Sequence, residues 1–334
     1  MGVMVGGMRD DQLPAPQPHA CSVLSRELDE PLAGTGAEAT AWVLVEQPGP
    51  WGRAAVTESR LDPALGAELE GRTAGTGVRL ALIRRVEDHH DAAPRHRRWF
   101  AASTHPKRTW LASGVVEYPT DLLKIDFTAL GAGDRRAVAA LDAEFPGTPL
   151  LGVCTNGKRD ACCATRGRQV AVAAEALDSA SGPGADAAFP AVWEITHLGG
   201  HRFAPTAVVL PSGYSYGRLD AASAVSVLAD ARHGRMAVAN CRGRSTWPRA
   251  GQVAELAVRS ALGETAQDAL DVVAVTQTAP DPEPAWTAVV EHPDGRAFAV
   301  SVTGALAAVP RPESCGKADG TPLELWVDTV DKIR

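Results

Sequence analysis

The sequence predicts a mixed α/β (α+β) fold, and three observations support this prediction. Short apolar runs rich in Val and Leu alternate with segments of helical periodicity. The order strand, loop, helix, strand, loop, hairpin occurs twice along the chain. Hydrophobic residues make up 45% of the 334 residues and charged residues 22%, which is enough for a sizeable core and excludes a largely disordered chain.

The first copy of this order has clear local signals. We expect a buried strand over residues 40–47, which the Pro-Gly-Pro-Trp-Gly run of residues 48–52 interrupts. A helix should follow, with Asp62 as its N-cap, Pro63 in its first turn and Gly71 at its end. Three further strands are expected over residues 78–85, 97–103 and 109–115. The stretches with His89, His90 and Arg95–Arg98 are interpreted as a solvated loop.

The second copy repeats the pattern. Its expected elements are a strand over 149–154, a polar loop, a helix over about 166–178, a strand over 191–196, a hairpin turning at Ser212 and Gly213, and a helix from Asp220 to Gly234. We infer a degenerate duplication, in which only the second copy has cysteines in its first loop.

This organisation predicts four parts. Residues 1–19 are expected to form a disordered tail, 20–135 the degenerate first half, 136–236 the second half, and 237–334 a small α+β region. That last region has a helical pattern over residues 250–262 and four strand-like runs.

Composition excludes several classes of protein. The formal net charge of -7 argues against a nucleic-acid binder. The absence of a long apolar run argues against a membrane protein, and the N-terminus lacks a secretion signal, so we expect a cytoplasmic protein. Six cysteines in such a protein argue against a disulfide framework.

The residues that carry chemistry form two short motifs. Cys154 and Cys163 have eight residues between them, and His197 and His201 have three. Each motif follows a predicted strand, and neighbouring strand ends can bring two such loops together at one edge of a sheet. Two thiolates and two imidazoles are good ligands for a soft or borderline metal centre.

Two metal centres fit these four donors. One is a tetrahedral Cys₂His₂ zinc site, and the other is a [2Fe-2S] cluster with two Cys on one iron and two His on the other. The cysteine spacing is long for a structural zinc site, where about two to four residues are usual. The Gly199-Gly200 pair favours a loop for the histidines, where glycine lets backbone approach a bulky inorganic group.

The motifs LLGVCTNGKRDACCATRG and VWEITHLGGHRFAPTAVVLPSGYSYGRL resemble the sucrase/ferredoxin-like family. The stretches PLAGTG and WVLVEQPGPWG also match that family, and RPESCGKADG is similar to a C-terminal motif of bacterial members. The resemblance covers about residues 20–235. It implies two thioredoxin-like units, of which the second binds a [2Fe-2S] cluster.

Carried over by position, the resemblance implies Cys154, Cys163, His197 and His201 as cluster ligands. Cys162 is an alternative to Cys163, although the family spacing favours Cys163. Relatives often have His where this chain has Asn156, a position outside the four ligands. Cys21, Cys241 and Cys315 are interpreted as buried or incidental thiols, and the role of Cys315 and the C-terminal region stays open.

These ligands predict an electron-transfer protein that need not be an enzyme. Two thiolates and two neutral imidazoles leave an oxidised cluster neutral, so its reduction potential should lie in the range of about -150 to +300 mV given for such centres. Ligand imidazoles can also couple electron transfer to a proton. An unidentified redox protein is the expected partner, and a basic group could dock it: Lys158, Arg159, Arg166, Arg168 and Arg202.

Two other functions stay open at this point. The same four residues could hold zinc in a binding module. Alternatively, a thioredoxin-like thiol oxidoreductase could use Cys162 or Cys163 as its redox thiol, although the chain lacks a C-x-x-C motif.

Overall fold

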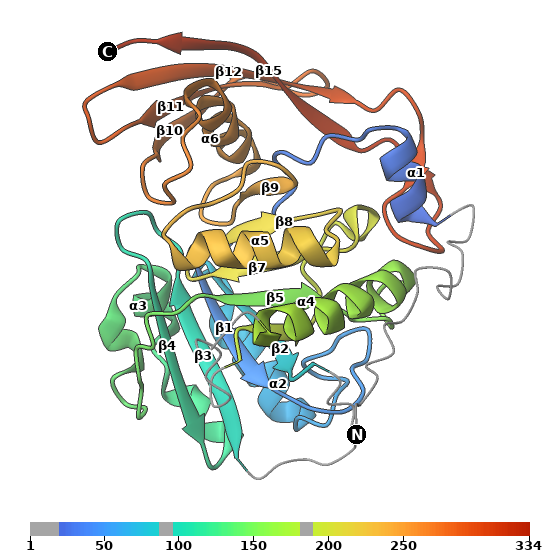
Figure 1. The fold of residues 1–334 in the computed structure, drawn as a ribbon, viewed down its shortest axis with the longest axis vertical. Coiled ribbons are helices and arrows are strands. Elements are labelled where there is room, and N and C mark those ends of the chain that lie inside the picture. The colour runs from blue at the N-terminus through green and yellow to red at the C-terminus, as the bar shows by residue number, and fades with distance from the viewer. Residues whose placement is uncertain (1–19, 87–95, 181–189) are drawn as a thin grey trace, which may run out of the picture.

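A nine-stranded mixed sheet runs through the computed structural model, which describes residues 20–86, 96–180 and 190–334 (Figure 1). The strand order is β4-β3-β1-β2-β6-β5-β7-β8-β9. The predicted tail of residues 1–19 and the stretch that contains His89, His90 and Arg95 lie outside the described residues. The mixed α/β fold class that the sequence predicts is confirmed.

The two halves of the sheet have the same strand pairing. β1 (Ala41–Glu46) pairs parallel with β2 (Val78–Arg84) and antiparallel with β3 (Arg97–Ser103), and β3 pairs antiparallel with β4 (Trp110–Val116). The same pairing recurs in β5 (Leu150–Cys154), β6 (Val192–Ile195), β7 (Ala207–Leu210) and β8 (Tyr214–Tyr216). An antiparallel contact between β2 and β6 joins the halves. The inferred duplication is thus visible in the topology.

Local signals explain where the main helices begin. Asp62 accepts hydrogen bonds from two backbone N–H groups of α2 (Pro63–Thr73), and Asp220 forms a capping box with Ser223 on α5 (Ala221–Arg232). The other helical elements of the two halves are α1 (Cys21–Glu27), η2 (Pro119–Lys124), α3 (Phe127–Gly131), η3 (Arg135–Val138), the π-helical η4 (Cys163–Gly167), α4 (Arg168–Ala180) and η5 (His201–Phe203).

Three apolar clusters hold this part of the chain together. One lies between the first half of the sheet and α2 and α3, and another between the second half and α4 and α5. In Figure 1, α4 and α5 lie over β5 and β7. The third cluster combines side chains from both halves, including Trp42 and Phe100 from the first half and Trp193 and Val208 from the second. Cys154 and Cys163 belong to this shared cluster.

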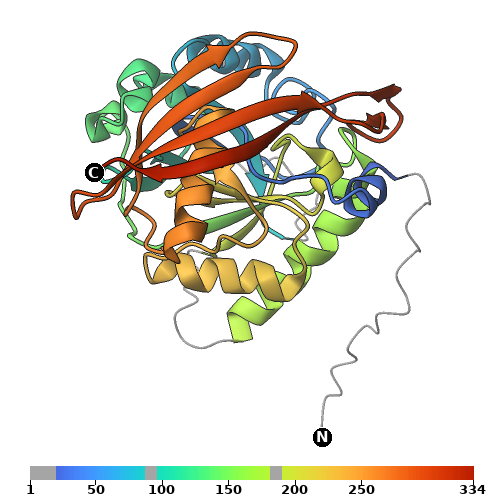
Figure 2. The ribbon, with the colours of Figure 1, turned by 90° about the horizontal axis from the view of Figure 1, so that it is seen from above.

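The C-terminal region contributes to the large sheet and also builds a sheet of its own. β9 (Cys241–Arg244) pairs with β8 at the edge of the nine-stranded sheet. The amphipathic α6 (Arg249–Leu262) packs on a four-stranded antiparallel sheet, as Figure 2 shows from above. Its strands are β10 (Asp271–Ala279), β11 (Ala285–Glu291), β12 (Ala297–Leu306) and β15 (Leu323–Lys332).

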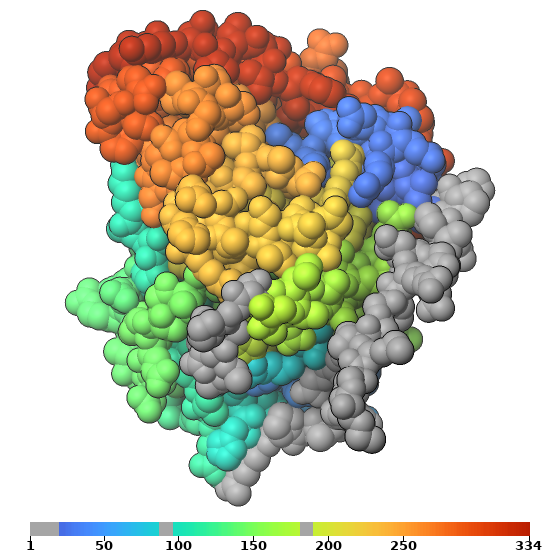
Figure 3. Space-filling view, viewed as in Figure 1, coloured from blue at the N-terminus to red at the C-terminus, as the bar shows by residue number. Residues whose placement is uncertain are grey.

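A small hairpin returns from this second sheet to the N-terminal segment. β13 (Arg311–Pro312) pairs with β14 (Asp319–Gly320), and β13 packs against α1. The space-filling view shows α1 in blue next to the C-terminal segment in orange and red (Figure 3). The N-terminal helix α1 and the C-terminal hairpin therefore meet beside the second half of the large sheet.

Two expectations about local structure were wrong. Arg97 and Arg98 do not lie in a solvated loop, because both belong to β3 and Arg97 is only 4% exposed. The helix expected from about Arg166 begins earlier, since η4 precedes α4 and starts at Cys163. Within the described ranges, no helix has both the length and the apolar character needed to cross a bilayer.

Candidate metal centre

The four predicted ligands lie at the ends of two neighbouring parallel strands. Cys154 is the last residue of β5, and His197 follows β6 by two residues. Cys163 is the first residue of η4, and His201 is the first residue of η5. π-helical segments are frequent at functional sites. The expectation that two strand ends bring the motifs together agrees with this arrangement.

Glycines allow the close approach of these segments. Gly199 and Gly200 have φ values of 80° and 66°, in the left-handed region that favours glycine. A Cβ at Gly167 would lie 2.1 Å from the carbonyl oxygen of Cys154, so the turn that carries Cys163 can pack on β5 only because Gly167 has no side chain.

The four side chains form one connected group. Cys163 shifts the pKa of the neighbouring Cys154, and the Sγ of Cys163 lies 3.6 Å from Nδ1 of His201. Among the described residues, Cys154 and His197 lie outside the group whose ligand atoms are close enough for one metal ion, which consists of Asp160, Cys163 and His201. The rings of His201 and His197 stack with their centroids 4.4 Å apart. The two cysteines are therefore neighbours of each other, and the two histidine rings stack on each other.

The electrostatic environment makes Cys154 the more acidic of the two thiols. The hydrogen bond from Cys163 lowers the pKa of Cys154 to about 7 against the effect of burial, and backbone N–H groups of Asn156 and Leu198 contribute. The same contact, together with burial, raises the pKa of Cys163 well above its ordinary value. A substantial fraction of Cys154 is therefore thiolate at neutral pH before any metal binds.

Both imidazoles are neutral over the physiological range. Burial is the largest cause of the lowered pKa of His197, which falls to about 3, and the neighbouring His201 and Arg79 add to it. Burial also lowers the pKa of His201 to about 4, although Asp160 opposes this change. Neutral imidazoles are the form that binds metals.

Two arginines add positive charge beside the thiols. Arg242 is 1% exposed, and its Nη1 donates to the carbonyl of Gly199 at 3.1 Å. Nη2 of the partly buried Arg79 donates to the carbonyl of His197 at 2.8 Å. Among the described residues, neither arginine forms a salt bridge with a carboxylate. Burial and the charges of Arg202 and Arg79 lower the pKa of Arg242 to about 9, while the sulfurs of Cys154 and Cys163 oppose this.

Sequence reasoning missed Asp160, which lies at the start of the helical turn that carries the cysteines. Its Oδ1 accepts the backbone N–H of Cys162 at 2.8 Å. Asp160, Cys163 and His201 each offer a ligand atom, and these atoms lie within 4.8 Å of one another. Asp160 directly precedes the first helical residue and is a recognisable N-cap signal, which we missed because we interpreted this stretch as a loop.

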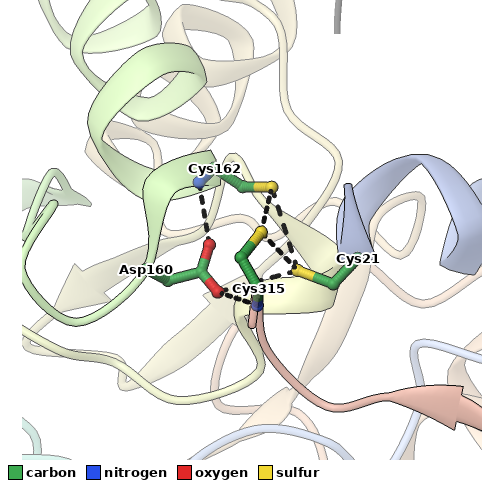
Figure 4. Close-up of side chains that lie close together, drawn as sticks. All are labelled: Cys21, Asp160, Cys162 and Cys315. Carbon is green, nitrogen blue, oxygen red and sulfur yellow. Dashed lines mark hydrogen bonds between the residues drawn. The ribbon is translucent and has the colours of Figure 1, made fainter. Parts of the chain in front are cut away.

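Cys162 and Cys163 point to different neighbours. Cys163 faces His201, whereas Cys162 faces Cys21 and Cys315, with sulfur separations of 3.8 and 3.3 Å (Figure 4). Cys21 is buried, as expected, and its sulfur and that of Cys315 join Cys162 in a second group that the sequence did not predict. Cys241 is buried by itself in the sheet core.

Fewer basic residues near the site are available to bind a partner than the sequence suggests. Arg202 forms a salt bridge with Glu30, a residue that also binds Arg311. Lys158 and Arg168 are exposed, and Arg159 and Arg166 are half-buried. Two cations therefore remain on the surface beside the Cys154–Cys163 loop.

Comparison with known proteins gives one family. The family model described as sucrase/ferredoxin-like matches residues 32–243. This range includes β1 to β8 of the two halves and all four predicted ligands. The comparisons with curated proteins and with solved structures each gave no match.

Proposed function

The chain belongs to the sucrase/ferredoxin-like family, and we propose that it is an electron-transfer protein that carries a [2Fe-2S] cluster on Cys154, Cys163, His197 and His201. One observation supports this proposal: the Sγ of Cys163 lies 3.6 Å from Nδ1 of His201, whose ring stacks on that of His197, and Cys154 adjoins Cys163. When bound, such a cluster would accept and release one electron.

The chemistry of the donor set fits this group. The imidazoles are neutral and the pKa of Cys154 is about 7, so these three donors are close to their metal-binding form, whereas Cys163 must release its proton when the metal binds. The hydroxyl of Thr206 is buried beside Cys154 and forms no hydrogen bond of normal geometry among the described residues. It is free to donate to a ligand sulfur, as outer residues of metal sites commonly do.

The surrounding residues favour the reduced state. Arg242 and Arg79 place positive charge beside the thiols in a buried environment, where charge interactions are strong. An added electron is therefore stabilised, and we expect a potential in the upper part of the range of about -150 to +300 mV. Because His197 is partly exposed, its imidazole can exchange a proton with solvent. The midpoint potential should therefore depend on pH.

An unidentified redox protein is the proposed partner. The exposed Lys158 and Arg168 lie on the segment that carries the cysteines, while the whole chain has a net charge of -7. A local basic surface on an acidic protein would orient an acidic partner towards the site.

Iron analysis tests the proposal. We expect purified wild-type protein to contain iron and acid-labile sulfide and to have a red-brown colour that dithionite bleaches. His197→Ala should lose most of this iron, whereas His233→Ala, which alters an exposed histidine on the last turn of α5, should keep it. A wild-type protein that contains no iron after anaerobic reconstitution would overturn the proposal.

A single zinc ion is the second candidate for these four residues. A tetrahedral zinc ion places a sulfur and a nitrogen ligand roughly 3.5 Å apart, given its usual bond lengths. The separation between Cys163 Sγ and His201 Nδ1 is 3.6 Å. A colourless protein with stoichiometric zinc that His197→Ala removes would favour this function.

A further inference from the structure

Three thiols that no step above uses converge beside the candidate centre. Cys21 comes from α1, Cys162 from the residue before η4, and Cys315 from the turn between β13 and β14 (Figure 4). Their Sγ atoms are separated by 3.8 Å (Cys21 to Cys162), 3.5 Å (Cys21 to Cys315) and 3.3 Å (Cys162 to Cys315). Three distant segments of the chain thus present sulfur to one point.

A carboxylate completes this group. Oδ2 of Asp160 lies 3.6 Å from the Sγ of Cys21 and accepts the backbone N–H of Cys315 at 2.8 Å. Asp160 is 3% exposed and forms no salt bridge among the described residues. A buried carboxylate next to three thiols is costly unless a cation neutralises it.

All four ligand atoms lie within 4.8 Å of one another, and their separations of 3.3 to 3.8 Å are close to those around one tetrahedral ion. With zinc–sulfur bonds of about 2.3 Å, two sulfur ligands lie roughly 3.8 Å apart, and a sulfur and a carboxylate oxygen lie roughly 3.6 Å apart. From this match we infer that Cys21, Cys162, Cys315 and Asp160 form a structural zinc site. It requires only Zn²⁺, and the thiol protons pass to solvent when the metal binds.

The surroundings support a closed structural site. Ser22 donates its hydroxyl to the Sγ of Cys162 at 3.2 Å and also its backbone N–H. The backbone N–H of Cys21 donates to Cys315. Such donors orient metal-bound thiolates. Cys21 and Cys162 are 1% and 3% exposed and Cys315 is partly exposed, so the group is largely enclosed by protein.

The site would fasten α1 and the C-terminal hairpin to the second half of the large sheet. α1 packs against η5, the turn that begins with His201, and β13 packs against α1. A metal between α1, the Cys162 turn and the C-terminal hairpin would therefore cover the histidine side of the candidate centre. This inference does not rest on the proposed iron cluster, because the two groups share no cysteine.

Metal analysis of the full chain, purified under reducing conditions and supplied with Zn²⁺, tests the inference. Wild-type protein should bind one zinc per chain, and zinc-edge X-ray absorption should show three sulfur neighbours and one oxygen. Cys315→Ser should lose the zinc and keep the iron, while His197→Ala should lose the iron and keep the zinc. Cys241→Ser, a change at a buried thiol outside both groups, should keep both metals.

Several outcomes would overturn the zinc site. These are the absence of zinc from wild-type protein, zinc retention at the wild-type level in Cys315→Ser, or a zinc environment of two sulfurs and two nitrogens. A protein that binds no zinc and whose mass is lower by two hydrogen atoms, which indicates a disulfide within this group, would also overturn it. If Cys315→Ser misfolds, zinc-edge X-ray absorption of the wild-type protein still tests the site. Three sulfurs and one oxygen identify this group, whereas two sulfurs and two nitrogens identify Cys154, Cys163, His197 and His201.

Discussion

The two halves of the large sheet share their strand order but differ in the loops that follow the first strand. After β1, Trp51 donates its indole N–H to the carbonyl of Gln47, and the guanidinium of Arg84 lies 4.0 Å from the indole centroid. After β5, the corresponding segment carries Cys154 and Cys163 and meets two imidazoles. The position after the first strand is thus occupied by an aromatic ring in the first half and by candidate metal ligands in the second half. The strands therefore position the site, while the loop residues supply its chemistry.

The largest change in metal content should follow substitution in the loop after β5 and not in the loop after β1. Cys163→Ser should remove nearly all bound metal from the candidate centre, because the serine hydroxyl is a much poorer ligand for a soft metal. Trp51→Ala should leave the metal content unchanged and lower the free energy of unfolding by about 3–5 kcal/mol, since Trp51 is 5% exposed. Metal analysis and denaturant unfolding of both variants check this. Loss of metal from Trp51→Ala in a folded protein would contradict the separation of roles.

The junction between the halves should be the next most sensitive position. Arg84 on β2 and Glu194 on β6 form an ion pair at 2.6 Å that is almost fully buried, and Thr155 also donates to Glu194. Glu194→Gln should lower the free energy of unfolding by about 3–5 kcal/mol, because it leaves a buried cation without its partner.

An exposed pair provides the control for this junction. Glu68 and Arg72 on α2 are each about half exposed, and Glu68→Gln should cost less than about 1 kcal/mol in urea denaturation. Equal effects of Glu194→Gln and Glu68→Gln would mean that the junction does not stabilise the fold.

A pH-dependent contribution to stability should come from Glu30, which pairs with Arg202 of η5 in the second half and with Arg311 of β13. Burial raises the pKa of Glu30, but hydrogen bonds and charges from Arg311 and Arg202 outweigh it, so the pKa of Glu30 lies below 4.5. The stabilisation is therefore complete above about pH 4.5 and is lost as the pH falls through the lower pKa of the folded state. In urea denaturation, the stability advantage of wild type over Glu30→Gln should shrink below pH 4.5. An advantage that stays constant down to pH 3 would argue against this linkage.

The smallest expected effect compares two N-caps. Asp62 accepts only from N–H groups of its own helix, whereas Asp160 also accepts from Cys315, far along the chain. Asp62→Ala should therefore cost about 1 kcal/mol, with no change in metal content. Thermal unfolding together with metal analysis measures both quantities. A change in bound metal on Asp62→Ala would show that the first half contributes to the site.

Local signals in the sequence predict much of this fold. The apolar run of β1, the Asp62 cap and the Asp220 cap each depend on residues a few positions apart, and the structure has these elements where the sequence indicates them. The two ligand motifs could also be found, because each is short and follows a strand.

The convergence of Cys21, Cys162 and Cys315 could not be predicted in this way. Cys21 and Cys315 are 294 residues apart, and nothing near either residue indicates a partner. Their meeting depends on how α1 and the C-terminal hairpin pack, which only the assembled chain determines. The early start of the helix at Cys163 was missed for a related reason, since Gly167 weakens the local helical pattern but is required by contact with Cys154.

Pulsed electron paramagnetic resonance of the dithionite-reduced protein tests the central claim most directly. If the four proposed ligands hold an iron–sulfur cluster, the reduced wild-type protein should give a signal with hyperfine coupling from two histidine nitrogens. In His197→Ala, either this coupling should decrease to that of one nitrogen or the whole signal should be lost. An iron signal without nitrogen coupling, or one unchanged in His197→Ala, would contradict the account.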